Sequence, residues 1–369
     1  MLKILCAALI VFSASGQHIA DTSQLVDEQM EACGAYELED ALPDYADDAL
    51  DKIGVDLNEG TAPDFEGIME VISEMASDSL RTPFSVCLSA LGIIVLCSLA
   101  KYILQNRSDG IGQAFDTASA AAAIICVGLS AAEFIRTTAQ GLEYICRFGS
   151  VLIPVMSVIA SAGGHSASAS SCSWITLAVM ESVSLGVSCF IVPVLKILLG
   201  ISLIAPLCEW FDFGKLTSSV EKLAKWAIGL AAGVISGAIA ISSVASSAAD
   251  GVSTRAARFL ISGTVPVVGG VLSDAIGTIS NCLGIVRGTV GAFGIIASLF
   301  IFLPPAMIAF MWMLGLNCLS WTASALGAER PAAAMRSLSS VASICLGLLA
   351  FVAMILICSA AIIMSLRSV

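Results

Sequence analysis

The sequence has little charge and almost no histidine, and it lacks the motifs that mark most enzymes. Charged residues make up 12% of the 369 residues and the mean hydropathy is +0.94, whereas soluble domains carry roughly 25% charged residues. The two histidines, His18 and His165, have no metal-ligand neighbours, and no phosphate-binding loop, HExxH or GxSxG motif occurs. No basic patch interleaved with aromatic residues is present. We therefore expect no enzyme activity, no metal or other cofactor, and no nucleic-acid partner.

The 13 cysteines do not form a disulfide or metal framework. No CxxC pair occurs, and Cys33 is the only cysteine in the acidic N-terminal part, so it has no local partner. A free cysteine behaves as a small apolar residue. Packing is therefore the expected role of the cysteines within apolar runs, which are Cys87, Cys97, Cys126, Cys189, Cys345 and Cys358.

The character of the chain changes abruptly near residue 82. Residues 17–80 hold 18 of the 29 acidic residues and one base, Lys52, for a net charge of −17, whereas the rest is mostly apolar. Before the acidic part, Lys3 precedes nine apolar residues and a small-residue stretch, which is the pattern of a signal peptide cleaved between about residues 14 and 20. Nine residues are too few for an uncleaved anchor to span a bilayer. We divide the chain into a signal peptide (1–18), an acidic extracytoplasmic segment (19–82) and a membrane domain (83–369).

The end of the acidic segment has helical periodicity. Apolar residues recur at helical spacing from Phe65 to Met75, and Glu66, Glu70, Glu74 and Asp78 form a row of like charges. Anionic lipid would repel such a helix, so its apolar face is expected to meet protein. The alternative is a solvated, partly disordered linker, which fits residues 20–60 best.

The remainder predicts an all-α, polytopic helical membrane protein with six to eight transmembrane or re-entrant helices and glycine-rich packing. Residues 173–207 are too long for one crossing, and Pro193 either splits them into a hairpin or kinks one long helix. Residues 259–283 are less apolar and span, re-enter or lie in the interface. The other candidate spans are 84–104, 114–132, 145–162, 225–248, 288–316 and 338–366.

The basic residues indicate an orientation. A secreted acidic segment places Lys101 and Arg107 inside, as the positive-inside rule requires. Three later loops are also basic, and they cannot all be inside if every gap holds one simple crossing. Broken or re-entrant segments are therefore expected near these loops, whose bases are Lys215, Lys222 and Lys225, then Arg255 and Arg258, then Arg330 and Arg336.

Two glycine patterns indicate close helix approach. Gly229, Gly233 and Gly237 form a tandem GxxxG, for which helix packing is the expected role. A second set repeats every seven residues, which on a helix makes a nearly straight stripe with polar residues in register on either side. The stripe either packs a helical hairpin or lines a water-filled path or a protein interface; Pro266 interrupts its start, and a turn near Asn281 would end it early. Its members are Gly263, Gly270, Ser273, Asp274, Gly277, Ser280, Asn281, Gly284, Arg287 and Gly291.

Charges inside apolar segments are costly and often functional. Glu181 and Lys196 could pair across a hairpin within 173–207, and Asp274 could pair with Arg287 if 259–291 folds back. Both structural pairing and function stay open for these four residues. The charges of residues 133–147 are expected near a membrane surface; they are Glu133, Arg136, Glu143 and Arg147.

The block PVVGGVLSDA at residues 266–275, followed by IVRGTVG at 285–291, resembles the stage III sporulation protein AE family of endospore-forming Firmicutes. The order of parts matches along nearly the whole chain. The resemblance implies a mother-cell membrane protein around the forespore, with its acidic segment in the intermembrane space. It also implies partners: other mother-cell stage III sporulation membrane proteins and, through them, a forespore membrane protein. Such an assembly is regarded as a secretion-like channel or feeding tube that late sigma-G activity requires.

Three functions follow from these features. The first is a membrane component of that channel complex, in contact with lipid and compatible with an oligomer. The second is a stand-alone solute carrier, because carriers use helices broken by proline and glycine with intramembrane charges such as Glu181 and Lys196. The third is a non-conducting membrane scaffold, which predicts that the glycine stripe is buried in protein and dry.

Overall fold

The fold is taken from a computed structural model. It describes residues 23–55, 65–104, 109–163, 166–186, 189, 192–204 and 269–365, with scattered positions between 218 and 241. Within these residues the chain is almost wholly helical and contains no strand, which confirms the predicted class of helical membrane protein. The predicted signal peptide, Gly263, Pro266 and the loop bases Lys215, Arg255 and Arg258 lie outside the described residues.

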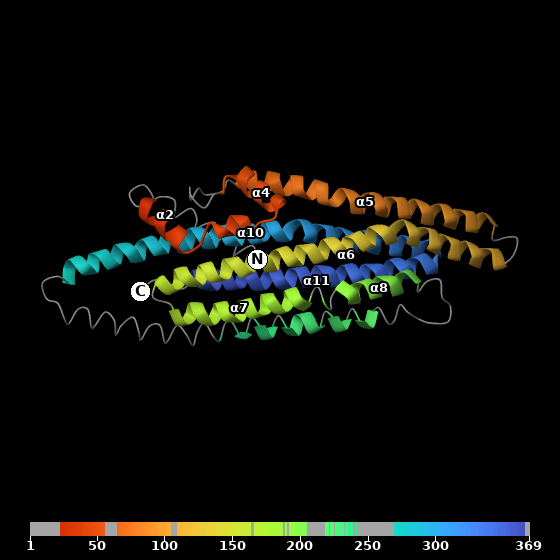
Figure 1. Ribbon diagram of the computed structural model, residues 1–369. Helices are drawn as coiled ribbons and strands as arrows, with labels where there is room; N and C mark the ends of the chain where they lie inside the picture. The colour runs from red at the N-terminus through yellow and green to blue at the C-terminus, as the bar shows by residue number, and fades with distance from the viewer. Residues whose placement is uncertain are drawn as a thin grey trace.

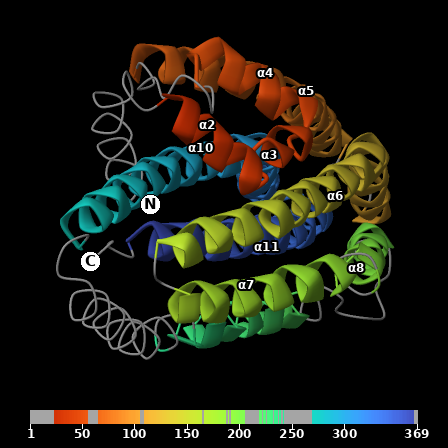
Figure 2. The ribbon, with the colours of Figure 1, turned by 60° about the vertical axis from the view of Figure 1, so that its left-hand side comes forward.

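Long helices run side by side along one axis (Figures 1 and 2). Three short helices lie at the N-terminal end, against the long ones. Helix α11 lies inside the bundle: it packs against α6, α7, α8 and α10 and is buried along most of its length. The helices are α2 (Ser23–Ala32), α3 (Glu37–Asp40), α4 (Asp44–Ile53), α5 (Phe65–Leu104), α6 (Asp109–Ala162), α7 (Ser166–Gly186), α8 (Val192–Ile204), α10 (Gly269–Ala325) and α11 (Glu329–Ser365).

Helix α6 joins two runs that the sequence predicted as separate spans. It has 54 residues and is therefore about 80 Å long at 1.5 Å per residue, far more than the roughly 30 Å of a hydrocarbon core. The charges at Glu133, Arg136, Glu143 and Arg147 do not interrupt it, because all four side chains are exposed on its outer side. The described residues contain four helices long and apolar enough to cross a membrane; the count for the whole chain stays a prediction.

Helix α5 runs straight through the change of composition at residue 82. It begins at Phe65 in the acidic segment and ends at Leu104, with Pro83 buried inside it. Ile68 and Val71 are buried, as expected for an acidic helix whose apolar face meets protein. The end of the acidic segment, from Phe65 onward, and the first apolar span therefore form one continuous helix.

Residues 173–207 form two helices in line and not a hairpin. Helix α7 ends at Gly186 and α8 begins at Val192, and the two continue in the same direction (Figures 1 and 2). Pro193 lies in the first turn of α8, where its missing N–H costs no helical hydrogen bond. The hairpin alternative was wrong, and Glu181 and Lys196 form no ion pair.

Helix α10 is continuous from Gly269 to Ala325, through Asn281 and the Pro304–Pro305 pair. No turn occurs at Asn281, so the described part of the glycine stripe does not fold back on itself. Asp274 and Arg287 lie thirteen residues apart on this helix, about 20 Å along its axis. The pairing considered for these two residues is therefore not formed.

The end of α5, the start of α6 and the turn between α10 and α11 meet at one end of the bundle. The Lys101 ammonium, near the end of α5, donates to the Gly327 carbonyl between α10 and α11 at 3.1 Å. The Arg330 guanidinium donates to the Thr117 hydroxyl of α6. Gly327 has φ +71°, a left-handed conformation that glycine adopts without strain at a helix C-terminus. Lys101 and Arg330 therefore lie at the same end of the bundle.

Candidate functional site

The acidic N-terminal helices are docked on the long bundle. Helix α4 begins after Pro43 and ends at Gly54, whose φ of +69° closes the helix with two backbone hydrogen bonds. Its apolar side is buried against α10 and α5 through Ala46, Ala49, Leu50 and Ile53, while its aspartates occupy the other side. At the edge of this contact the Lys52 ammonium lies 2.6 Å from Glu74 of α5, with both side chains more than half exposed. One carboxylate of the predicted acidic row is thus neutralised within the chain.

A hydrogen bond links α4 to a backbone group that a proline has freed. The Tyr45 hydroxyl donates to the Ile301 carbonyl of α10 at 3.0 Å. In an uninterrupted helix this carbonyl would accept from the N–H of residue 305, but Pro305 has no N–H. Burial, and then the nearby Tyr144, raise the pKa of Tyr45 well above its ordinary value, so its hydroxyl is protonated and able to donate at physiological pH.

Helix α6 completes this site. A Cβ added at Gly141 would lie 2.8 Å from the Pro305 ring, so only glycine lets α6 approach the proline this closely. One turn later, the Tyr144 ring meets the Tyr45 ring edge-on, with centroids 6.3 Å apart and planes at 73°. We call this set, Tyr45, Gly141, Tyr144, Ile301 and Pro305, the proline–tyrosine junction.

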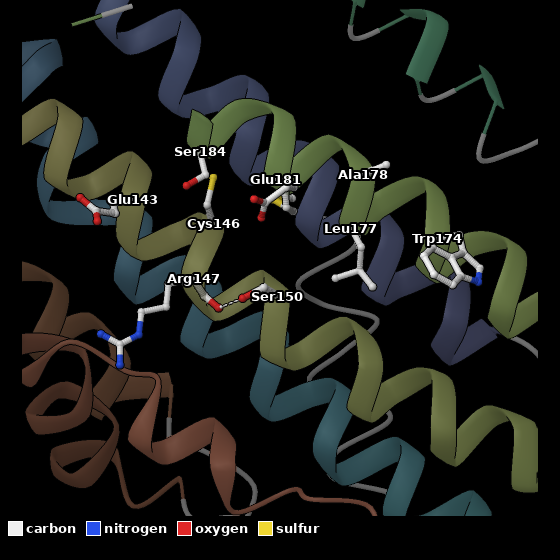
Figure 3. Close-up of a pocket in the computed structure, with 10 residues that line it drawn as sticks. Glu143, Cys146, Arg147, Ser150, Trp174, Leu177, Ala178, Glu181 and Ser184 are labelled. Carbon is white, nitrogen blue, oxygen red and sulfur yellow. Dashed lines mark hydrogen bonds between the residues drawn. The ribbon is translucent and has the colours of Figure 1, made fainter. Parts of the chain in front are cut away.

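A pocket of about 590 Å³ lies in the groove between α6 and α7 (Figure 3). Glu181 points towards Cys146 of α6, whereas Glu143 and Arg147 point away from α7 (Figure 3). The Ser150 hydroxyl donates its hydrogen bond to the Arg147 carbonyl at 2.7 Å. The remaining lining is largely apolar and includes the exposed Trp174. No group of three or more metal-ligating side chains occurs among the residues that the structure describes.

The glycine stripe lies on α10, and its two ends differ. The helix backbone carries Gly270, Ser273, Asp274, Gly277, Ser280 and Asn281, whose side-chain surroundings are outside the described part. At the other end Arg287 is buried, with 8% of its surface exposed. A Cβ at Gly291 would lie 2.4 Å from Met364 and 3.0 Å from Met156, so this end is packed against α11 and α6. Gly284 is half-buried, with open space where a Cβ would stand.

The tandem GxxxG and the paired charges are not assembled into a site. Gly229 and Gly233 are exposed, Gly237 is half-buried, and a Cβ added at any of them would meet nothing within 4 Å. The predicted packing of these glycines is therefore not made with any described part of the chain. Glu181 and Lys196 are both exposed, on successive helices.

Sequence reasoning missed the proline–tyrosine junction. Pro304 and Pro305 lie inside the predicted span 288–316, and the sequence analysis assigned them no role. A signal was present, however: each proline inside a helix leaves a carbonyl without its usual donor, so a donor from another element is required if that carbonyl is buried. Nothing in the sequence pointed to Tyr45 as this donor, because 256 residues separate it from Ile301.

Comparison with known proteins shows which family this chain resembles. The curated "Stage III sporulation protein AE" of Bacillus subtilis (strain 168) is 21% identical over 210 residues, which is 56% of this chain and 53% of that protein, so the match spans about half the length of the relative. No solved structure matches the chain. The family model described as stage III sporulation protein AE matches residues 54–366, which include the whole long-helix bundle and the end of the acidic segment. This chain therefore belongs to the stage III sporulation protein AE family.

Proposed function

We propose that this chain is an integral membrane component of a channel-type complex between mother cell and forespore, needed for sporulation and late sigma-G activity. The observation that carries the proposal is the family match over residues 54–366. Four long apolar helices support a multi-pass position in the mother-cell membrane around the forespore. The acidic segment then faces the intermembrane space, with the Lys101 and Arg330 end in the mother-cell cytoplasm.

The partners in this proposal are the other mother-cell stage III sporulation membrane proteins and, through them, a forespore membrane protein. No enzymatic role is proposed, because neither the family match nor a sequence motif indicates one. The test is a clean deletion in the spore-forming host, with spore counts and a late forespore reporter as readouts. Normal sporulation and reporter expression in the deletion strain would contradict the proposal.

A non-conducting scaffold is the second candidate, and one observation favours it. The described end of the stripe, at Arg287 and Gly291, is packed in protein, as a scaffold predicts. A stand-alone carrier has less support, because Glu181 and Lys196 are exposed and unpaired with one another. Uptake of a solute by vesicles that contain only this protein would restore the carrier hypothesis.

The water accessibility of the glycine stripe distinguishes the conduit hypothesis from the scaffold hypothesis. Single cysteines would be placed at Ser273, Ser280 and Leu272 in a cysteine-free chain that still supports sporulation, and then treated with a membrane-impermeant thiol reagent. Labelling at 273 and 280 but not at 272 indicates a water-exposed polar face and a conduit. Protection at all three positions indicates a packed interface and a scaffold.

A further inference from the structure

We infer that lipid acyl chains surround only one half of the long bundle, and that the half bearing the acidic helices stands outside the hydrocarbon although its helices are also apolar. This inference rests on the proposed membrane role and deepens it. The membrane-facing half, called the turn half, lies between two levels of charged and polar residues. The other half is called the head half. It contains helix α7, the C-terminal part of α6, the first part of α10 and the C-terminal end of α11.

The first level is the end of the bundle where the end of α5, the start of α6 and the turn between α10 and α11 meet. Lys101 bonds to Gly327, and Arg330 bonds to Thr117, so α5, α6, α10 and α11 all reach the level of these residues. The second level is marked by one pocket that Thr82 and Pro83 of α5, Glu133 of α6 and Trp312 of α10 line together. The exposed Arg81 and Arg136 lie next to these residues in sequence.

The distance between the levels fits a bilayer. Residues 82–100 of α5 and 117–132 of α6 contain no charged residue, and they measure about 28 Å and 24 Å at 1.5 Å per residue. The hydrocarbon core of a bilayer is about 30 Å thick. Arg336 lies three residues before Ser339, whose hydroxyl bonds the Met313 carbonyl beside Trp312. Arg336 is also six residues, about 9 Å, after Arg330 of the first level, so it lies between the two levels, and its long side chain must extend to place its charge at the surface.

Large apolar side chains face outwards mainly in the turn half. Leu96 is 69% exposed, Ile125 is 72% and Leu129 is 83%, as expected for a surface that lipid covers. Further exposed apolar residues in this half are Phe84, Leu88, Leu99, Tyr102, Ile103, Phe310, Leu314 and Trp321.

Along α10 and α11, the head half keeps its apolar side chains inside protein. Between residues 341 and 363 of α11, only Ala350 is exposed, so burial by neighbouring helices accounts for the hydrophobicity of this helix. No large apolar residue of α10 between 283 and 303 is exposed. On α6 and α7 beyond the charged residues 143–147, the large apolar residues that remain exposed are Val158, Trp174 and Leu185.

Acidic helices occupy the position that lipid would otherwise take beside α10. A pocket of about 360 Å³ brings Glu39, Asp47 and Asp51 next to Phe293 of α10, and Tyr45 bonds Ile301 a little further along. Carboxylates are strongly disfavoured in hydrocarbon. A bilayer centred on the head half would place these carboxylates in hydrocarbon, whereas a bilayer centred on the turn half leaves them in water.

Quenching of tryptophan by brominated lipid tests this placement. The full-length chain would keep one tryptophan at a time, with the other four replaced by phenylalanine, in vesicles of phosphatidylcholine brominated in mid-chain. A tryptophan-free chain carrying Leu129→Trp reports on the turn half, native Trp321 is its matched control, and native Trp174 reports on the head half. Emission from positions 129 and 321 should fall severalfold relative to unbrominated vesicles, and emission from Trp174 should stay unchanged.

Quenching of Trp174 as strong as that at position 129 would overturn the inference and leave the membrane role intact. Absence of quenching at all three positions would overturn the inference and the membrane role together. Nitroxide labels at Leu96→Cys and Val158→Cys provide a second test if the tryptophan variants fold poorly. The label at position 96 should be more accessible to oxygen, which concentrates in hydrocarbon, than the label at position 158. Equal accessibility to oxygen at both positions would also overturn the inference.

Discussion

The Tyr45 hydroxyl donates to the Ile301 carbonyl across 3.0 Å, and Ile301 is the residue whose helical acceptor bond Pro305 removes. One side chain of the acidic segment thus replaces a backbone hydrogen bond of the longest helix. Replacement of Tyr45 by phenylalanine should weaken the docking of α4, because the carbonyl loses a donor inside a packed contact. The expected cost is about 1–3 kcal/mol, measured as faster amide exchange in α4.

The control for this change is Tyr102→Phe, because Tyr102 is 79% exposed at the end of α5. Its removal should leave exchange in α4 unchanged. Equal exchange in Tyr45→Phe and in the parent chain would show that the hydroxyl contributes nothing to docking.

Gly141 should tolerate no side chain. The rigid Pro305 ring would lie 2.8 Å from an added Cβ, so Gly141→Ala must push α6 away from α10. Overpacking of this kind costs about 1–3 kcal/mol, which thermal unfolding in detergent would detect as a lower Tm. Gly92→Ala is the matched control, since nothing lies within 4 Å of its Cβ. It should stabilise helix α5 by roughly 0.5–1 kcal/mol, and an equal loss in both variants would refute the steric explanation.

The docking of α4 should strengthen as the pH falls. Partial burial, followed by repulsion from Asp51, Asp48 and Asp44, raises the pKa of Asp47 in the folded state. A raised carboxyl pKa means that the folded state binds more protons than the unfolded state, so stability falls as the pH rises through the two pKa values. Amide exchange in α4, corrected for its intrinsic rate, should therefore be slower at mildly acidic pH than at neutral pH.

Asp47→Asn should reduce this pH dependence, whereas Glu28→Gln, at an exposed position of α2, should preserve it. Identical pH profiles for Asp47→Asn and the parent chain would remove Asp47 as the cause.

Thr176 of α7 and Ser359 of α11 should behave as a coupled pair. Their hydroxyls lie 2.8 Å apart, and both side chains are fully buried. Thr176→Val or Ser359→Ala alone should cost about 1–2 kcal/mol, since each leaves a buried hydroxyl without this partner. The double variant should cost less than the sum of the two single variants in a thermal or denaturant cycle. Strict additivity would mean that the bond contributes nothing to the α7–α11 contact.

Composition and periodicity were sufficient for the helical class and for the apolar runs, because long uncharged stretches have few other structures available to them. They failed at the ends of helices. The charges of residues 133–147 were predicted to lie near a membrane surface between two separate spans, yet these residues continue α6, since all four charged side chains are exposed on its outer side. Pro193 lies in the first turn of α8, where its missing N–H costs no helical hydrogen bond, whereas Pro83 lies inside α5, which continues through it.

The candidate sites were harder to predict for a physical reason. The heptad of glycines was visible in the sequence, but the partners of Gly291, Met156 and Met364, depend on which helices meet. The same is true of Gly141 and Pro305. Close approach between helices is decided by the tertiary arrangement, and a single sequence carries no information about it.

The bond between Tyr45 and Ile301 also sets an order of events during synthesis. The two residues are 256 positions apart, and at about 5–20 residues per second the ribosome needs roughly 13–50 s to travel between them. Throughout that interval α4 has no α10 to cover Ala46, Ala49 and Leu50. The acidic helices, whose aspartates keep them hydrated, can therefore dock only after the last third of the chain has been synthesised. Docking of the N-terminal segment is thus among the final steps of folding.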